Sequence, residues 1–429
     1  MEEIVIAGEK KLVEDFYDVF SKLLSVRIEN SDELTEFISN NCGNAVLCFY
    51  DEEQMINRMG CKGFLYRKDF YVASDFFFLL DFKDKKEPLN SVLFNELYFW
   101  VNGDRENCDH TLYEAEIKSD GEVYLCCSAR LPYSIGNIYE LSFVDIWKSI
   151  RATIIRRSTQ NGSSCFCRNG SCQELKNREP DVGSIKRVVT LSDFPLNLNV
   201  AIDDECNLHC SMCRNSVQLT SKIEIEKRQY LVDVIEREVL ENCVNLYVAG
   251  DGEFFFSRIY NELFERICKR KEKYSATLIL LTNGNLFDGD KVKKLSDIFS
   301  AVDVMVSIDA ATEYTYNKIR RGGKFKNVLS TLDELKKLKK EKIIRKTGIR
   351  FVIQKSNYME IMPFIKLGEE NNVDFIDMTR LVMSESMTTE EFQEESLLDE
   401  HGILKEEYKN WFKSNKITNN YVRLDDAFQ

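Results

Sequence analysis

Apolar and polar positions along the second half of the chain repeat in a strand–helix pattern. Short apolar runs typical of buried strands occur at residues 196–202, 246–249, 276–281, 302–308, 349–353 and 375–378. Between them, apolar residues recur at helical spacing, as in 231–240 and 328–338. Six such units in residues 195–384 predict an α/β fold with a parallel sheet, open or curled into a partial (β/α)6 TIM-type barrel. Functional residues should then lie at the carboxyl ends of the strands.

Residues 1–97 show a smaller repeat of the same kind. Apolar runs at 4–7 and 45–50 predict two strands, and Ser31 is a suitable N-cap for a helix through Ile38. These features predict a small Rossmann-like α/β domain with a parallel sheet. The segment has no GxGxxG motif, so a dinucleotide site is only weakly indicated, and a docking or substrate-presenting role is equally open.

Residues 98–176 have few long periodic segments, several turn signals and six cysteines. This composition predicts a small cysteine-rich module held together by metal rather than by a large apolar core. A polar linker at 177–194 separates the module from the strand–helix repeat. Residues 385–429 are predicted to form an acidic, helical tail.

Charge and hydropathy exclude several classes of protein. The chain has 429 residues and a net charge of −13, which disfavours binding to nucleic acid because phosphate neutralisation needs a basic surface. The most apolar stretch, residues 70–82, is interrupted by Asp75 and Asp81 and is shorter than the ~20 residues that a membrane span needs. The N-terminus lacks the pattern of a secretory signal. We therefore expect a cytoplasmic protein that binds neither nucleic acid nor membrane.

The clustering of the cysteines indicates metal or redox chemistry in a reducing compartment. Cys206, Cys210 and Cys213 follow the first strand of the repeat in the spacing C-x3-C-x2-C. Three thiolates on one loop can bind three irons of a [4Fe–4S] cluster and leave the fourth iron open to a small molecule. Zinc is the alternative, but it needs a fourth ligand. His209 is the candidate, although its position next to Cys210 would strain a tetrahedral site.

The cysteine loop resembles that of the radical S-adenosylmethionine (SAM) superfamily, and further motifs of that family follow in order. Residues 250–253, GDGE, resemble the GGE motif after the second strand, and residues 282–284, TNG, follow the third. Residues 307–325, SIDAATEYTYNKIRRGGKF, resemble the family segment that follows the fourth strand. The resemblance covers about residues 196–382 and implies a SAM-binding [4Fe–4S] cluster on the three cysteines.

The same resemblance implies which residues contact SAM. The GDGE backbone and carboxylate would hold the ammonium group, whereas Ser307, Asp309 and Arg320 would contact the ribose and carboxylate. A helix-terminal salt bridge is the alternative role for Arg320. Met212 replaces the aromatic residue common in the family and would cover the adenine. The implied SAM contacts are Met212, Gly250, Asp251, Gly252, Glu253, Thr282, Asn283, Ser307, Asp309, Arg320 and Asn357.

A second resemblance lies in residues 108–172. The segments GEVYLCC, IGNIYELSFVDIWKS and IRRSTQNG resemble the SPASM auxiliary-cluster domain that many radical SAM enzymes carry. The resemblance implies one auxiliary [4Fe–4S] cluster, with a four-cysteine zinc site as the alternative. The module precedes the barrel here, whereas in the family it usually follows. Its implied ligands are Cys108, Cys126, Cys167 and Cys172.

Two further cysteines, Cys127 and Cys165, are alternative cluster ligands or free thiols. A free thiol near the substrate would return a hydrogen atom to a substrate radical, and the outcome would be epimerisation. Electron transfer to the auxiliary cluster would instead give an oxidation or a cross-link.

These resemblances imply an oxidoreductase or epimerase that reductively cleaves SAM and takes a hydrogen atom from its substrate. The electron would come from a flavodoxin- or ferredoxin-type reductant. We expect a carbohydrate, nucleotide-sugar or other small-molecule substrate slightly more than a ribosomal peptide or partner protein. An iron–sulfur electron carrier or scaffold without radical chemistry is the competing hypothesis, but it would not need the GDGE motif or the 307–325 motif.

Overall fold

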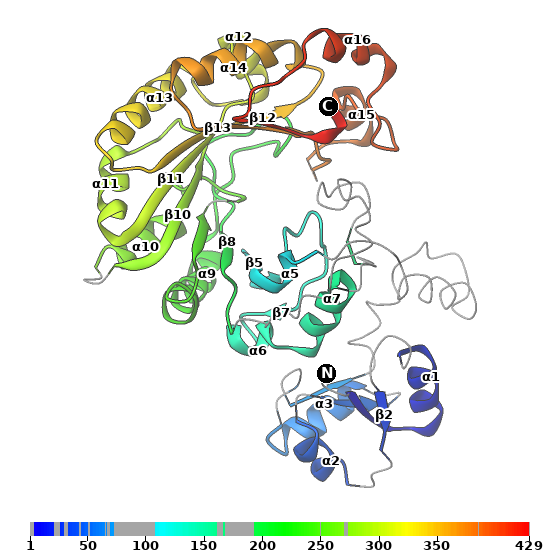
Figure 1. Cartoon of the computed structure of the whole chain (residues 1–429). Coiled ribbons are helices and arrows are strands. Elements are labelled where there is room, and N and C mark those ends of the chain that lie inside the picture. The colour runs from blue at the N-terminus through cyan, green and yellow to red at the C-terminus, as the bar shows by residue number, and fades with distance from the viewer. Residues whose placement is uncertain are drawn as a thin grey trace. The chain divides into compact units, whose positions relative to one another are not determined.

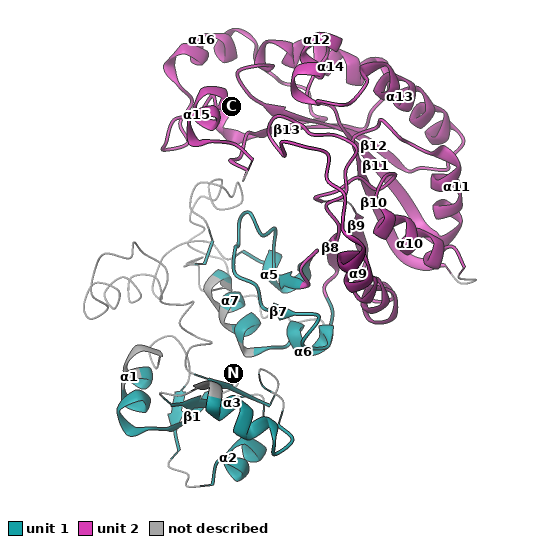
Figure 2. Cartoon of the chain, turned by 180° about the vertical axis from the view of Figure 1, so that it is seen from behind, with its two compact units in different colours: residues 1–115, 122–194 teal, residues 116–121, 195–429 magenta. Residues whose placement is uncertain are grey.

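The computed structural model describes residues 4–20, 26–29, 33–42, 44–49, 52–64, 66, 69–72, 108–160, 166–167, 193–248, 250–269, 273–384 and 386–428. The chain divides into two compact units (Figure 2). One comprises Met1–Ala115 and Glu122–Phe194, and the other comprises Glu116–Gly121 and Pro195–Gln429. Within the described residues, no helix combines the length and the apolar character that crossing a membrane requires.

The second unit is built on a sheet of parallel strands that follow one another in chain order (Figure 1). All six predicted strands are confirmed. Along β11 the apolar side chains of Val302, Val304 and Val306 are buried. The strands are β8 (Asn197–Ala201), β9 (Asn245–Val248), β10 (Tyr274–Thr282), β11 (Phe299–Ser307), β12 (Lys346–Ile353) and β13 (Phe375–Arg380). This arrangement is consistent with a partial TIM barrel.

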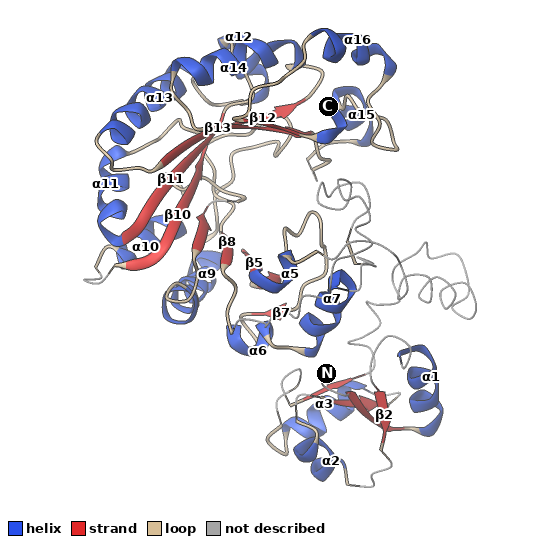
Figure 3. Cartoon of the chain, in the orientation of Figure 1, coloured by secondary structure: helices blue, strands red, loops and turns tan. Residues whose placement is uncertain are grey.

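Helices connect consecutive strands and run along the outer face of the curved sheet (Figure 3). Their apolar side is buried, as for Val328, Leu332 and Leu335 of α13. The helix α9 begins at a capping box formed by Ser221 and Glu224. The connecting helices are α9 (Lys222–Val234), η2 (Ile235–Val239), α10 (Arg258–Ile267), α11 (Gly289–Ile298), α12 (Glu313–Ile319), α13 (Phe325–Lys340), η3 (Tyr358–Glu360) and α14 (Ile361–Glu370).

The C-terminal tail contains helices and also contributes a strand that the sequence did not predict. β14 (Val422–Leu424) pairs in parallel with β13, with Val422 opposite Ile376. Three residues are too few to show a strand periodicity, so the sequence pattern could not reveal it. The helices of the tail are α15 (Thr389–Glu395), α16 (Glu406–Ser414) and η4 (Asp426–Phe428).

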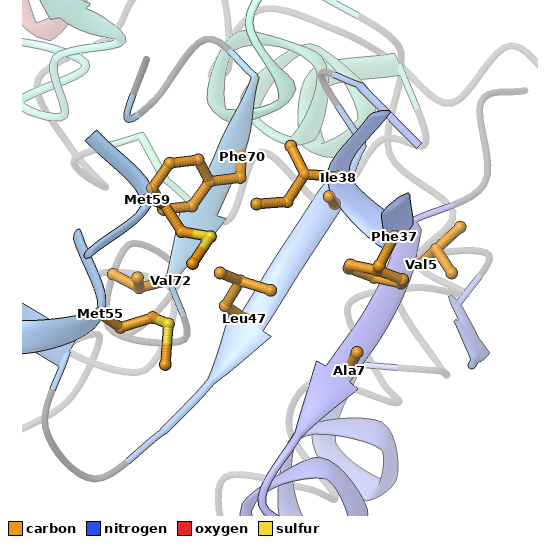
Figure 4. Packing of buried hydrophobic residues seen from close by; sticks show 10 residues of the cluster. Val5, Ala7, Phe37, Ile38, Leu47, Met55, Met59, Phe70 and Val72 are labelled. Atoms are coloured by element: carbon orange, nitrogen blue, oxygen red, sulfur yellow. The ribbon is translucent and has the colours of Figure 1, made fainter. Parts of the chain in front are cut away.

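The N-terminal part of the first unit contains a four-stranded sheet in the order β2-β1-β3-β4, with parallel pairs throughout. Phe37 and Ile38 of α2 pack in one apolar cluster with Leu47 of β3 and Phe70 of β4 (Figure 4). The Rossmann-like character of this part stays a prediction. The elements are β1 (Ile4–Gly8), α1 (Lys10–Phe20), β2 (Val26–Ile28), α2 (Leu34–Asn40), β3 (Ala45–Cys48), α3 (Glu52–Gly60) and β4 (Phe70–Val72).

The cysteine-rich segment consists of short elements around a small aromatic core. Trp147 is fully buried, and the guanidinium carbon of Arg156 lies 4.2 Å from its ring centroid. Arg156 also donates hydrogen bonds to the carbonyl oxygens of Trp147 (2.8 Å) and Thr111 (3.0 Å). The elements are α5 (His110–Tyr113), β5 (Glu114–Lys118), β6 (Glu122–Tyr124), β7 (Gly136–Asn137), α6 (Phe143–Trp147) and α7 (Ile150–Gln160).

Candidate functional site

The loop that follows β8 brings three thiols to the carboxyl end of the sheet. The Cys213 backbone N–H donates to the carbonyl of Cys210 (3.0 Å), and Arg214 donates to the Cys213 sulfur (3.4 Å). Burial alone would lower the pKa of Arg214, but the nearby sulfurs of Cys213, Cys206 and Cys210 raise it. Arg214 therefore lies close enough to the three predicted ligands for their charges to act on it.

Burial disfavours the thiolate form of these cysteines, and two arginines partly offset it. Burial raises the pKa of Cys206 to about 11 and also raises that of Cys210. Arg214 opposes the shift at Cys206, and Arg320 opposes it at Cys210. Cationic neighbours stabilise thiolates, which are the form that binds iron.

Two buried carboxylates brace the cysteine loop, and sequence reasoning did not single them out. Asp203 forms a salt bridge with Arg228 and accepts a hydrogen bond from the Thr220 hydroxyl (2.9 Å). Glu205 accepts from the Thr220 N–H (2.9 Å) and from the Arg258 backbone (2.9 Å). Burial would raise the pKa of Glu205, but hydrogen bonds from Arg258 and Thr220 lower it. Both carboxylates come just before the first cysteine in the chain, whereas their arginine partners belong to helices further along the chain.

The GDGE turn packs directly against this loop. A β-carbon on Gly252 would lie 2.6 Å from the Asp203 carbonyl oxygen, so only glycine fits there. A β-carbon on Gly250 would lie 3.2 Å from that of Ala201. The Asp251 carboxylate forms a salt bridge with Lys118, which belongs to the same unit.

The Glu253 side chain is 1% exposed, and both of its oxygens accept hydrogen bonds within the protein. One accepts from the Thr282 hydroxyl (2.6 Å) and the other from the Asn283 backbone N–H (2.6 Å). Burial raises the pKa of this carboxyl. Glu253 therefore joins the turns after β9 and β10, and its contact with SAM stays a prediction.

Asn283 continues this connection to the cysteine loop. Its amide nitrogen lies 3.9 Å from the Cys206 sulfur and donates to the Asn207 side chain (2.9 Å). The TNG motif after the third strand is a common turn sequence, and here its Asn283 contacts Cys206, one of the predicted metal ligands.

The motif after β11 places an ion pair beside the second cysteine. Asp309 is fully buried with a φ of 61° and forms a salt bridge with Arg320. Arg320 also reaches the Cys210 sulfur (3.8 Å). Burial lowers the pKa of Arg320, but Asp309 and Cys210 outweigh it, so the pKa lies above its ordinary value. Ser307 ends the strand beside this pair. Arg320 therefore forms a salt bridge at the C-terminal end of α12, which was the alternative role considered for it. It also contacts Cys210, one of the predicted cluster ligands.

Asn357 and Met212 meet other protein groups. The Asn357 amide donates to the carbonyls of Asp309 (2.9 Å) and Val352 (2.9 Å), so it ties two strand ends together. The Met212 sulfur accepts a hydrogen bond from the Gln354 side chain (3.6 Å), which is 1% exposed. Sequence reasoning missed Gln354, although its position after β12 was the available signal.

No group of three or more His, Cys, Asp or Glu residues in the described ranges is arranged to bind a single metal ion. A cubane differs from a single-ion site because each thiolate binds a different iron, which spaces the sulfurs more widely. His209, the candidate zinc ligand, has a buried Nδ1 without a hydrogen-bond partner among the described residues. The donor set of three thiols thus fits a cluster better than zinc.

The predicted auxiliary ligands are only partly described. Cys108 is buried and its N–H donates to the Thr159 carbonyl (2.9 Å). Burial, with the charges of Glu114 and Cys127, raises the pKa of Cys126. Cys167 is partly buried and Cys127 is exposed, whereas Cys165 and Cys172 lie outside the described residues. The four-cysteine ligand set stays a prediction.

Comparison with known proteins gives two family matches. Residues 202–367 match the Radical SAM superfamily, and residues 108–173 match SPASM, an iron–sulfur cluster-binding domain. These ranges confirm that the SPASM region precedes the radical SAM region in the chain. No curated protein matches the sequence.

Several solved structures are similar to parts of the chain. Streptococcus suis SuiB bound to precursor peptide SuiA matches with 17% identity over 44% of this chain and 40% of that one, with a TM-score of 0.33. A histidine-tagged form of anSMEcpe with bound AdoMet matches with 20% identity over 51% and 58%, with a TM-score of 0.37. The chain thus spans about half the length of these proteins. Similarities this low say nothing about its substrate.

Proposed function

We propose that this chain, which contains a radical SAM domain and a SPASM domain, cleaves SAM reductively and uses the resulting radical on a peptide or partner protein. The radical SAM domain binds a [4Fe–4S] cluster and SAM, and SPASM binds a further iron–sulfur cluster. Cys206, Cys210 and Cys213 would hold the first cluster. When bound, it supplies the electron that yields methionine and a 5′-deoxyadenosyl radical.

The observation that supports this proposal is a loop with three cysteines and two arginines at its sulfurs. Arg214 contacts the Cys213 sulfur (3.4 Å), and Arg320 contacts the Cys210 sulfur (3.8 Å). Arg320 and Asp309 would orient the SAM carboxylate and ribose, and the glycines of the GDGE turn would allow close backbone approach. The buried hydrogen bonds of Glu253 hold that turn in place.

The N-terminal sheet gives no support to the nucleotide-sugar substrate that the sequence slightly favoured. In parallel α/β sheets, ligands bind at the strand ends where helices begin, and phosphates bind helix N-termini. Here α2 follows Glu33 and carries Glu36 in its first turn, whereas α1 begins with Lys10 and Lys11. The two carboxylates at the start of α2 would repel a phosphate there. We therefore take the peptide or partner-protein alternative as the proposal to be tested.

Three cysteine variants test the proposal. After anaerobic reconstitution and dithionite reduction, Cys210→Ala should abolish 5′-deoxyadenosine formation, because that cluster loses a ligand. Cys167→Ala should leave SAM cleavage measurable but stop product formation. Cys268→Ala, at the C-terminal end of α10, is the control and should keep both activities. Equal loss of cleavage in the first two variants would contradict separate roles for the clusters, and no 5′-deoxyadenosine from the wild type would favour an electron carrier.

Substrate class and reaction outcome need separate tests. Cell extract is split into a protease-digested fraction and an undigested one, and mass spectrometry follows SAM-dependent products. Loss of product after digestion supports a peptide or protein substrate, whereas survival of product supports a small molecule. Cys127→Ala then tests whether this thiol returns a hydrogen atom to the substrate radical. If the reaction is an epimerisation, the variant should accumulate products other than the epimer. If the reaction is an oxidation, the variant should form the same product as the wild type.

A further inference from the structure

The C-terminal segment forms a groove that neither cluster uses. The groove has a volume of about 820 Å³, within the range of about 300–1,000 Å³ typical of ligand sites. Its apolar walls include Phe412 of α16, Leu424 of β14 and Phe428 of η4. The Phe412 and Phe428 rings stack with centroids 5.3 Å apart. Ile403, 57% exposed, forms a further part of the wall. We call this site the C-terminal groove.

The charged residues of the C-terminal groove all have one sign. Lys409, Lys413 and Lys416 line it, and no described lining residue is acidic. Lys409 forms a salt bridge with Glu406 (2.7 Å). Within the described residues, the side-chain ammonium groups of Lys413 and Lys416 form no salt bridge or hydrogen bond, although the charge of Lys413 acts on Glu406. Exposed cations beside an apolar wall, in a chain of net charge −13, mark a site for an anionic ligand with apolar parts.

We propose that the C-terminal groove binds an acidic, apolar stretch of the peptide or partner protein that is the substrate. The inference rests on the proposed function for its substrate class. A chain segment suits the groove because strand β14, helix α16 and two loops border it, so that several side chains can bind at once. Carboxylates of the segment pair with Lys413 and Lys416, while its Leu or Phe side chains cover the apolar wall.

Fluorescence anisotropy with the full chain tests the proposal. The probe is a fluorescein-labelled ten-residue peptide in which Glu alternates with Leu and Phe. Two comparison peptides replace every Glu by Lys, or every Leu and Phe by Ser. The variant Lys413→Glu/Lys416→Glu reverses the groove charge. Lys337→Glu/Lys340→Glu is the matched control, because these lysines have the same spacing and also lie at the end of a helix, α13.

The acidic apolar probe should bind, more weakly at higher salt, and both comparison peptides should bind at least tenfold more weakly. Groove charge reversal should weaken binding by about tenfold, and Ile403→Ser should also weaken it, whereas the α13 control should match the wild type. Equal binding by the groove variant and the control would overturn the proposal. So would a concentration-dependent dimer that the groove variant abolishes, since a second copy would then be the occupant.

SAM cleavage separates this proposal from the proposed function. Without substrate, the groove variants should form 5′-deoxyadenosine at the wild-type rate, because they lie outside the cluster loop. Normal cleavage with no groove-dependent peptide binding refutes the groove proposal alone. Groove-dependent binding by a wild type that makes no 5′-deoxyadenosine refutes the proposed function and leaves the groove as a binding site.

Discussion

Replacing Asp309 with Asn tests whether the ion pair beside the second cysteine holds the site together. Asp309 is fully buried, and the Arg320 side chain is 11% exposed. One Asp309 oxygen accepts the Val352 N–H (2.7 Å), and the other accepts from Arg320 (2.6 Å). Asparagine keeps the shape and one acceptor, but it places an NH2 group against the guanidinium or leaves Val352 without its acceptor.

The expected cost follows from the uncompensated charge. Removing one partner of a buried ion pair typically costs about 3–5 kcal/mol, because the other charge stays buried. Asp303, in the strand β11 that precedes Asp309, offers a comparison, since it pairs with Arg345 (2.7 Å) and the two side chains are 13% and 49% exposed. Solvent screens this pair more than the buried one, so Asp303→Asn should cost less than Asp309→Asn.

Urea unfolding of the iron-free chain, followed by circular dichroism, measures these costs without interference from bound cofactor. The double variant Asp309→Asn/Arg320→Met removes both charges and should recover about 2 kcal/mol of the loss. It should still fail to cleave SAM after reconstitution, because Arg320 no longer reaches Cys210. If Asp309→Asn costs no more than Asp303→Asn, or if the double variant is less stable than the single one, the electrostatic account of this pair is wrong.

Two further predictions concern the GDGE turn and the tail. Gly252→Ala should cost about 1–3 kcal/mol in urea unfolding and reduce iron incorporation, because its β-carbon would meet a backbone oxygen at 2.6 Å. Gly60→Ala, with no atom within 4 Å of the added carbon, should be neutral or stabilising. Burial would raise the pKa of Asp425, but Arg380 lowers it below the usual 3.8. The Arg380–Asp425 pair therefore stabilises the fold above pH 3.8, and this stabilisation is lost as the pH falls through the lowered pKa. Asp425→Asn should therefore cost roughly 3 kcal/mol at pH 6 and clearly less at pH 3, and an equal cost at both would contradict this.

The sequence predicted the sheet of the second unit well because its strands contain buried apolar residues and amphipathic helices separate them. The runs at 276–281 and 302–308 correspond to β10 and β11, and only the ends differ. β14 escaped prediction for the opposite reason. It has three residues, two of them only half-buried, and the Arg380–Asp425 salt bridge that follows it joins residues 45 positions apart, which no local pattern shows.

The motifs located the site but not the bonds within it. Spacing alone showed that Cys206, Cys210 and Cys213 lie on one loop. It did not show that Asp203 and Glu205 brace this loop, because their partners Arg228 and Arg258 lie about one and two helices further along the chain. Salt bridges between distant residues depend on tertiary packing, which periodicity does not encode.

The most buried polar residues of the site join neighbouring strand ends to one another. The Glu253 N–H donates to the Glu205 carbonyl (2.8 Å), its carboxylate holds the turn after β10, and Asn283 in that turn reaches Cys206. Each of these contacts connects residues that are at least 30 positions apart in the chain. The cysteine loop is therefore positioned by hydrogen bonds between protein groups. Because a preorganised ligand set loses less entropy on binding, these residues should affect cluster assembly even where they touch neither iron nor SAM.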